Sequence, residues 1–358
     1  MMDPRTLISV STLFVLASSC LHVGEARTAR DVEIGTDAHD GLRIVVAEGA
    51  AAIRSFEAGQ VHLWSNAPEL DIEIDPGART GPWDVRIDNT LTDVEIEGSE
   101  LLPSPVPTEH RFRVQLDGKT TLHLRAPDRA RLEPWRFLFF ADVQDAIDRV
   151  QDLYGSMNGE TGARFALIGG DLTEGGTRPQ LQRFERELKS LNVPAFATLG
   201  NHELFDEDGI PYQELYGRAS SHFTFRGVSF SQLDSSSSSI DPVVYDWLDG
   251  WLADGKDKLH VVTMHIPPLD PIGARAGCFA SKMEAQKLLQ RLADARVDLT
   301  LYGHIHSYYG FSNAGIPAFI AGGGGAIPER LDGMGRHYLV IDVDPVAQRL
   351  TTTLRRID

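Results

Sequence analysis

Residues 135–144 read Trp-Arg-Phe-Leu-Phe-Phe-Ala-Asp-Val-Gln, an apolar run broken only by Arg136 and followed by Asp142 and Gln144. A continuous apolar run of this length predicts a buried β-strand. The two polar residues then lie just beyond its carboxyl end, which is where open α/β sheets bind their ligands. This stretch therefore predicts an α/β fold with a polar site at one end of a sheet.

Four later segments end in polar residues in the same way, and helical periodicity separates most of them, for example over 181–191 and 283–292. The polar ends are Gly170-Asp171, Gly200-Asn201-His202-Glu203, His265-Ile266-Pro267-Pro268 and Gly303-His304-Ile305-His306. Alternating strands and helices are typical of α/β architecture. A chance arrangement would not place seven potential metal ligands at strand ends, so we expect these side chains to converge on one site.

The order of these motifs resembles that of the calcineurin-like metallophosphoesterase family, over roughly residues 135 to 345. The resemblance implies two β-sheets flanked by helices, and a hydrolase that acts on phosphoric ester bonds with two divalent metal ions. It implies that Asp142, Gln144 and His306 hold the first metal and that Asn201, His265 and His304 hold the second. Asp171 would bridge the two metals. A metal-bridging hydroxide would attack phosphorus, and His202 would assist the leaving group as general acid or electrostatic stabiliser.

Two positions depart from patterns known in this family. The family usually has His where this chain has Gln144. The Gln side-chain oxygen is a neutral, hard donor, so we expect Mn before Zn, with Fe also suitable. The alternative is that Gln144 only caps the helix that follows it. Glu174 stands where purple acid phosphatases carry a metal-binding Tyr, which argues against that subgroup.

The region before residue 135 has a different pattern of apolar and polar residues. Apolar residues alternate with polar ones in short runs, such as Leu42 to Val46, Leu70 to Ile74 and Phe112 to Leu116, and turn residues separate the runs. Period two predicts half-buried strands, and their spacing predicts a small all-β sandwich over 33–132. The alternating pattern gives way to continuous apolar runs near Pro134. We therefore expect a second domain over 133–358, and we expect a fragment that begins at about Arg131 to fold by itself. The protein partner of the β-rich domain is unknown.

The N-terminus resembles an export signal. An apolar run from Leu7 to Ala17 follows Arg5 and ends in Ala17-Ser18-Ser19-Cys20. The run is too short to span a bilayer but suits a signal peptide over 1–20. It resembles a bacterial lipoprotein signal with lipid on Cys20, and ordinary cleavage further on is the alternative. Residues 21–32 would form a tether. We therefore expect a secreted, periplasmic or cell-surface protein, and a lipid on Cys20 would attach it to a membrane.

The net charge limits the partners. A formal charge of −17 disfavours nucleic acid, because duplex binding needs clustered Lys and Arg. A small phosphate ester remains the expected substrate, and the metal-ligand residues do not distinguish a monoester from a diester. The alternative function is a non-catalytic surface binding protein on a metal-bound phosphoesterase-like scaffold.

Overall fold

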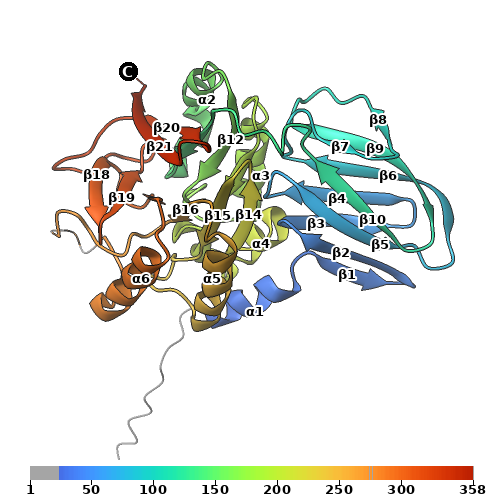
Figure 1. Cartoon of the computed structure of the whole chain (residues 1–358), viewed down its shortest axis with the longest axis horizontal. Helices are drawn as coiled ribbons and strands as arrows, with labels where there is room; N and C mark the ends of the chain where they lie inside the picture. Colours follow the sequence, from blue (N-terminus) through green and yellow to red (C-terminus); the bar gives the residue numbers. More distant parts are fainter. Residues whose placement is uncertain (1–23, 274, 276, 358) are drawn as a thin grey trace, which may run out of the picture.

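The computed structural model describes residues 24–357 except 274 and 276. A β-sandwich built from the N-terminal third lies beside a larger part in which two sheets carry helices (Figure 1). The predicted signal peptide and Cys20 lie outside the described residues. Among the residues described, no helix is long and apolar enough to cross a membrane.

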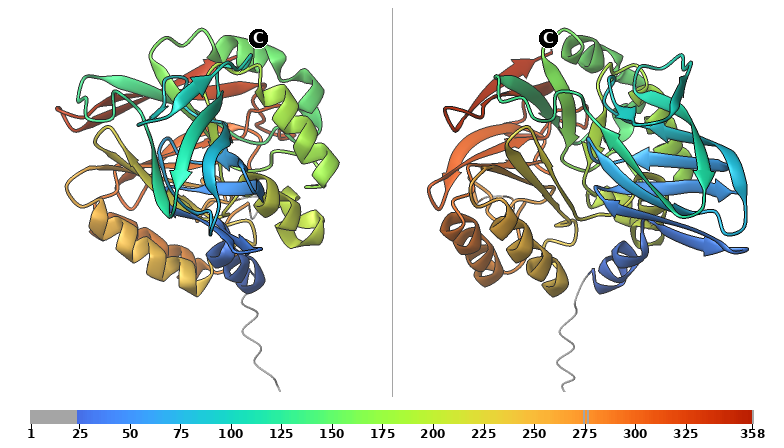
Figure 2. Two further views of the ribbon diagram at one scale, coloured as in Figure 1. Left: turned by 90° about the vertical axis from the view of Figure 1, so that its right-hand side faces the viewer. Right: turned by 45° about the vertical axis from the view of Figure 1, so that its right-hand side comes forward.

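The sandwich consists of two five-stranded sheets, and Figure 2 shows it from its own side. The first sheet contains β1 (Thr36–His39), β2 (Leu42–Glu48), β5 (Leu70–Asp75), β10 (Thr120–Arg125) and β7 (Glu95–Ile96), in this spatial order. The second contains β3 (Ala51–Glu57), β4 (Gln60–Ser65), β6 (Thr80–Asp88), β9 (Glu109–Asp117) and β8 (Glu100–Leu102). All neighbours are antiparallel except β4 and β6. Leu70, Ile72 and Ile74 are fully buried while their neighbours are half-buried, as the alternation predicted.

The larger part contains two further sheets. One has the order β13 (Ala195–Ala197), β12 (Ala163–Ile168), β11 (Trp135–Phe140), β20 (His337–Asp344) and β21 (Arg349–Arg356). The other has the order β14 (Ser221–Phe225), β15 (Val228–Leu233), β16 (Leu259–Met264), β17 (Leu299–Tyr302), β19 (Ile316–Ala321) and β18 (Tyr308–Asn313). Strands β11, β12 and β13 are parallel, and so are β15, β16, β17 and β19. Their carboxyl ends therefore bring the predicted site residues to one end of each sheet.

Helices cover the outer faces of both sheets. In Figure 2, α5 and α6 lie together on one side, while α3 and α4 lie on the other. The helices of the larger part are α2 (Gln151–Met157), α3 (Arg178–Leu188), α4 (Ile210–Tyr216), α5 (Pro242–Asp254), α6 (Lys282–Asp294) and the 3-10 helices η1 (Gln144–Arg149), η2 (His202–Phe205) and η3 (Glu207–Gly209). Local sequence sets where three helices begin, because Thr177, Asp241 and Ser281 accept a hydrogen bond from the first turn.

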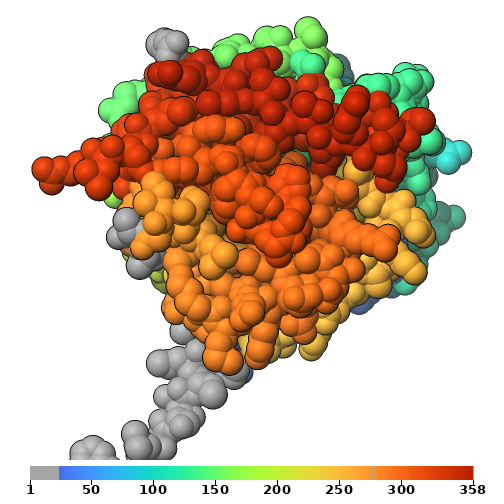
Figure 3. All heavy atoms as spheres, turned by 60° about the vertical axis from the view of Figure 1, so that its left-hand side comes forward, coloured from blue at the N-terminus to red at the C-terminus, as the bar shows by residue number. Residues whose placement is uncertain are grey.

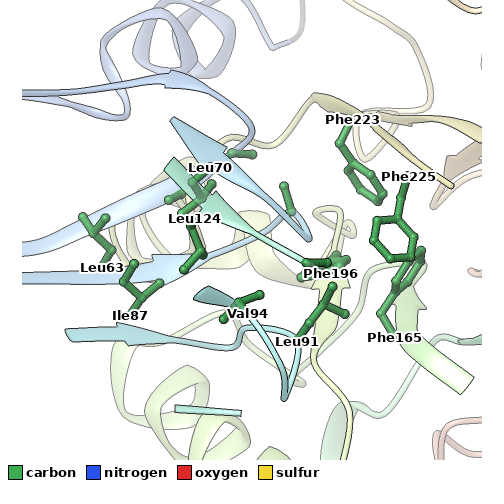
Figure 4. Close-up of a cluster of buried hydrophobic side chains, with 14 of the residues drawn as sticks. Leu63, Leu70, Ile87, Leu91, Val94, Leu124, Phe165, Phe196, Phe223 and Phe225 are labelled. Carbon is green, nitrogen blue, oxygen red and sulfur yellow. The ribbon is translucent and has the colours of Figure 1, made fainter. Parts of the chain in front are cut away.

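One hydrophobic core runs through both parts of the chain. Figure 4 shows Leu91 and Val94 of the sandwich near Phe165 and Phe196 of the larger part, and all belong to one buried cluster. The predicted domain limits, 33–132 and 133–358, stay predictions. A continuous core means that the two parts protect each other's apolar surface from water.

Residues 21–32 do not form the expected tether within the described range. Helix α1 (Glu25–Glu33) packs against the larger part, and Arg27 and Asp31 are 2% and 1% exposed. Arg27 forms ion pairs with Asp234 (2.9 Å) and Asp208 (2.5 Å). The tether prediction was wrong for the residues of α1. This helix is mostly polar, so the sequence shows no apolar face that would predict its burial. Its burial depends instead on the distant ionic partners of Arg27.

Candidate metal centre

The structure brings all seven predicted ligand residues together. Asp142 follows β11, Asp171 follows β12, Asn201 follows β13, His265 follows β16, and His304 follows β17. The sheets meet here, because the His304 N–H donates to the Asp142 carboxylate (3.0 Å) and the His265 ring nitrogen Nδ1 contacts the Gly169 carbonyl (2.7 Å). Ligand atoms of Asp142, Asp171 and His265 lie within 4.8 Å of one another, which is close enough to share metal ions.

One group of contacts surrounds the Oδ2 atom of Asp171. The Gln144 side-chain amide lies 3.0 Å from this oxygen and 3.1 Å from Nε2 of His306. His306 Nε2 is in turn 3.5 Å from Oδ1 of Asp142. The two ends of an amide are nearly equal in size, so a half-turn of the terminal bond would direct Oε1 of Gln144 to the same place. Gln144 is also the first residue of η1, so its position suits both a ligand and a helix start.

A second group surrounds the other oxygen of Asp171. His265 Nε2 lies 3.2 Å from Oδ1 of Asp171 and 3.0 Å from Oδ1 of Asn201. The ring of His304 is 5.2 Å from the ring of His265, centroid to centroid. Asp171 therefore lies between two sets of donors, each facing one of its oxygens. This arrangement would allow two metal ions to share the Asp171 carboxylate.

The backbone is strained at four of the seven residues. Asp142, Gln144, Asp171 and His304 have φ values of 63°, 49°, 53° and 70°, in the left-handed region that side chains disfavour. Such strain persists only where the surroundings determine the conformation, and it concentrates at functional sites. Nearby glycines allow the close packing: a Cβ on Gly200 would lie 2.2 Å from Oδ1 of Asp171, and one on Gly322 would lie 2.9 Å from Oδ2 of Asp142.

The histidine rings are oriented as metal ligands would be. Nδ1 of His265 faces the Gly169 carbonyl and Nδ1 of His306 faces the Ile327 carbonyl, both at 2.7 Å. A carbonyl only accepts hydrogen bonds, so each Nδ1 must donate. In the neutral ring, each Nε2 then has its lone pair directed into the site. Together with two buried carboxylates, these donors fit divalent metal ions with mixed oxygen and nitrogen coordination.

The electrostatics of the centre attract cations. Burial alone would raise the pKa of Asp171, but the neighbouring His265 and His202 lower it well below its usual value. Burial would lower the pKa of His265, but the Asp171 carboxylate raises it to about 9. His306 likewise has its pKa raised to about 9, against burial, by Asp142. The negative field that holds a proton on these rings also attracts a metal ion, which binds in place of the proton.

Glu203 has a supporting role that the sequence did not reveal. It is fully buried and accepts hydrogen bonds from the backbone N–H groups of Asp171 (3.0 Å), Gly200 (3.0 Å) and Thr173 (3.1 Å). Burial and the charge of Asp171 raise the pKa of Glu203 to about 8. Its carboxyl group fixes the turns that carry Asp171 and Asn201. In the sequence, only the position of Glu203 at the end of the Gly-Asn-His-Glu motif could have indicated this role.

His202 lies beside the ligand residues and is 19% exposed. Its backbone N–H donates to Oδ1 of Asp171 (2.9 Å), and its Nδ1 donates to the Glu174 carbonyl (2.8 Å). Nε2 therefore faces the centre, 3.8 Å from Oδ2 of Asp171. A solvent-accessible imidazole in this position can reach a leaving group without being a ligand.

The strand order, the flanking helices and the site at the strand ends define a metallophosphoesterase type of fold, which confirms the expected fold class. Residues 136–308, a little under half of the chain, match the model of the calcineurin-like phosphoesterase family. The resemblance predicted from the motifs is thus confirmed.

Known proteins agree with this assignment at low identity. A 3',5'-cyclic-nucleotide phosphodiesterase of Nostoc sp. (strain PCC 7120) is 26% identical over 150 residues, which is 40% of this chain and 56% of that protein. The chain therefore spans little more than half the length of this relative. A purple acid phosphatase, PPD1 from yellow lupin (Lupinus luteus), superposes on 81% of this chain and 70% of its own, with a TM-score of 0.55 and 13% identity. This superposition shows similarity of fold alone.

Proposed function

We propose that this protein is a hydrolase of phosphate esters that uses two divalent metal ions. The seven predicted residues would hold them: Asp142, Gln144 and His306 the first, Asn201, His265 and His304 the second, with Asp171 shared. The observation that carries the proposal is the placement of separate donor sets at the two oxygens of Asp171. Bound metals would supply positive charge for the phosphate and lower the pKa of water to near neutral.

The chain's own residues account for the remaining steps. Asp171 is ionised and buried, and Glu203 holds its loop in place. His202 has its Nδ1 fixed by the Glu174 carbonyl, so a proton on Nε2 could pass to the leaving oxygen. An oxygen of water would form the new bond to phosphorus, and the bond to the leaving alcohol would break.

Metal analysis and turnover test this proposal together. We expect the purified protein to contain two metals per chain, to lose hydrolysis of p-nitrophenyl phosphate or its bis-ester on chelation, and to regain it best with Mn. The preference for Mn follows from the amide oxygen of Gln144. Full turnover by the metal-free protein would refute the proposal. The relative rates on the two compounds would show whether monoesters or diesters are preferred.

We also propose export, with cleavage near Cys20 and lipid on that residue. The motivation is the apolar run before Cys20. Mass spectrometry of protein recovered from cells would show a mature N-terminus at Cys20 with an added lipid mass. An intact Met1 would contradict export.

A further inference from the structure

Several exposed apolar side chains follow strands whose carboxyl ends lie at the candidate metal centre. Across the described residues, eleven large apolar side chains are exposed, and five of them lie in the segments that follow β13, β16 and β19. We use the term apolar rim for Phe205 (67% exposed), Leu269 (36%), Ile327 (76%) and Leu331 (93%). Exposed apolar clusters of this kind usually mark a binding surface.

Two residues of the apolar rim contact residues of the candidate centre, Phe205 through its ring and Ile327 through its backbone carbonyl. The ring of Phe205 lies 4.9 Å from the ring of His202, centroid to centroid. The Ile327 carbonyl accepts the hydrogen bond from Nδ1 of His306. Phe205 follows a strand of one sheet and Ile327 follows a strand of the other. The apolar rim therefore approaches the centre from both sheets.

The loop that carries Leu331 is held firmly. The Gly333 N–H donates to the Glu329 carbonyl (2.9 Å), and the Glu329 N–H donates to the His306 carbonyl (3.1 Å). Arg275 makes two hydrogen bonds to the Asp332 carboxylate, at 2.8 and 3.1 Å. This loop belongs to the C-terminal half, whose orange and red segments form most of the face in Figure 3. Leu331 is thus exposed to solvent on a turn that hydrogen bonds and an ion pair hold in place.

The charges near the apolar rim favour a substrate with little charge. Asp332 and Glu329 both pair with Arg275, so its guanidinium is not available to an anion. Arg330 is the exposed basic residue of the same turn. A polyphosphate would need several cations here, against a chain charge of −17. A phosphodiester carries a single negative charge and two ester groups.

We propose that the apolar rim binds an alkyl or aryl ester group of a phosphodiester substrate. This inference rests on the proposed function, because the phosphate of the same molecule would lie at the metal-ligand residues. Water would add oxygen to phosphorus, one phosphorus–oxygen bond would break, and the leaving oxygen would take a proton. The remaining ester group would stay on the phosphorus and on the apolar rim.

Three diesters that share one leaving group test this inference. They are methyl p-nitrophenyl phosphate, hexyl p-nitrophenyl phosphate and thymidine 5'-p-nitrophenyl phosphate, assayed with Mn. We expect kcat/KM for the hexyl ester to exceed that for the methyl ester by about tenfold, which corresponds to burial of roughly two methylene groups. Phe205→Ser or Leu331→Ser should reduce the hexyl-to-methyl ratio several-fold. Leu101→Ser is the matched control, because Leu101 is 59% exposed in the sandwich, and it should keep the ratio.

Equal kcat/KM for the hexyl and methyl esters would overturn the inference, and so would a preference for the thymidine ester, which would indicate a nucleoside site. Absence of turnover on all three would count against the proposed function. Binding separates the two failures: calorimetry should find dihexyl phosphate bound at least tenfold more tightly than dimethyl phosphate, and Leu331→Ser should reduce that difference. Equal binding of the two diesters would refute the apolar rim independently of catalysis.

Discussion

The side-chain amide of Asn66 makes the same pair of hydrogen bonds to Ala197 that a neighbouring β-strand would make. Its Nδ2 donates to the Ala197 carbonyl (2.8 Å), and its Oδ1 accepts from the Ala197 N–H (2.7 Å). Asn89 does the same at Ala195, at 2.8 and 2.9 Å. The sandwich thus completes the edge strand β13, which leads to Asn201.

Asn66→Ala should therefore destabilise the protein strongly. Asn66 is fully buried, so its loss leaves the Ala197 N–H without a partner, at a cost of about 1–3 kcal/mol, while the Ala197 carbonyl keeps the hydrogen bond that the Tyr212 hydroxyl donates (2.8 Å). Asn158→Ala is the matched control, because Asn158 makes the same pair of bonds to Ser190 and Asn192 at the surface. Urea unfolding of both variants would measure the difference. Equal small losses would mean that the amide does not support β13.

The fragment from Arg131 to Asp358 should not fold on its own. The sequence suggested that it would, but the shared core leaves Phe165, Phe196 and Phe223 uncovered once the sandwich is removed. We expect a molten or aggregated fragment that binds a hydrophobic dye. The chain from Gly24 to Asp358 is the control and should unfold in one transition. A soluble fragment with native near-ultraviolet dichroism would contradict this expectation and confirm that the domain folds by itself.

The convergence of the seven candidate ligands could be predicted from the sequence better than the contacts between the two parts of the chain. Each ligand stands next to a continuous apolar run, so the strand and its polar end could be recognised from local order. The roles of Asn66, Asn89 and Arg27 depend on partners more than 100 residues away. Alternating apolar and polar residues in the sandwich also show which face of a strand is buried, but they do not show which part of the chain packs against that face. Strands β1, β3, β4 and β8 were missed for lack of a clear pattern of period two.

The buried Asp31 should make stability depend on pH. Burial raises the pKa of Asp31 to about 6, although the N–H groups of Ala219 and Ser220 donate to it. The folded state then binds the proton more tightly than the unfolded state, so stability is lost as pH rises from about 4 to 6. Asp31→Asn should gain roughly 3 kcal/mol relative to wild type between pH 4 and pH 8. Asp37→Asn, at an exposed site, is the control, and a pH-independent difference for Asp31→Asn would disprove the effect.

Asp171→Asn should impair the centre more than Gln144→Ala. Asp171 faces both donor sets and supplies a charge, whereas Gln144 supplies one neutral donor. We expect Asp171→Asn to lose bound metal and to slow turnover by roughly 100-fold or more, and Gln144→Ala to slow it by roughly tenfold. Asp145→Asn is the control, because Asp145 is exposed and adjacent in sequence. Unchanged metal content and rate in Asp171→Asn would exclude the shared ligand.

His202→Ala should slow alkyl esters far more than p-nitrophenyl esters. An alkoxide leaving group needs the proton that Nε2 of His202 is placed to give, while p-nitrophenolate departs without it. General acid catalysis supplies about 10²–10⁴-fold, so a loss in this range is expected on the alkyl substrate only. Metal content should not change, because the side chain of Asn201 and not that of His202 contacts His265, and His202→Ala keeps the backbone N–H that donates to Asp171. His123→Ala, an exposed histidine in the sandwich, is the control and should leave both rates unchanged. If His202→Ala slows both substrates equally, or in proportion to lost metal, then His202 orients the loop and is not the acid.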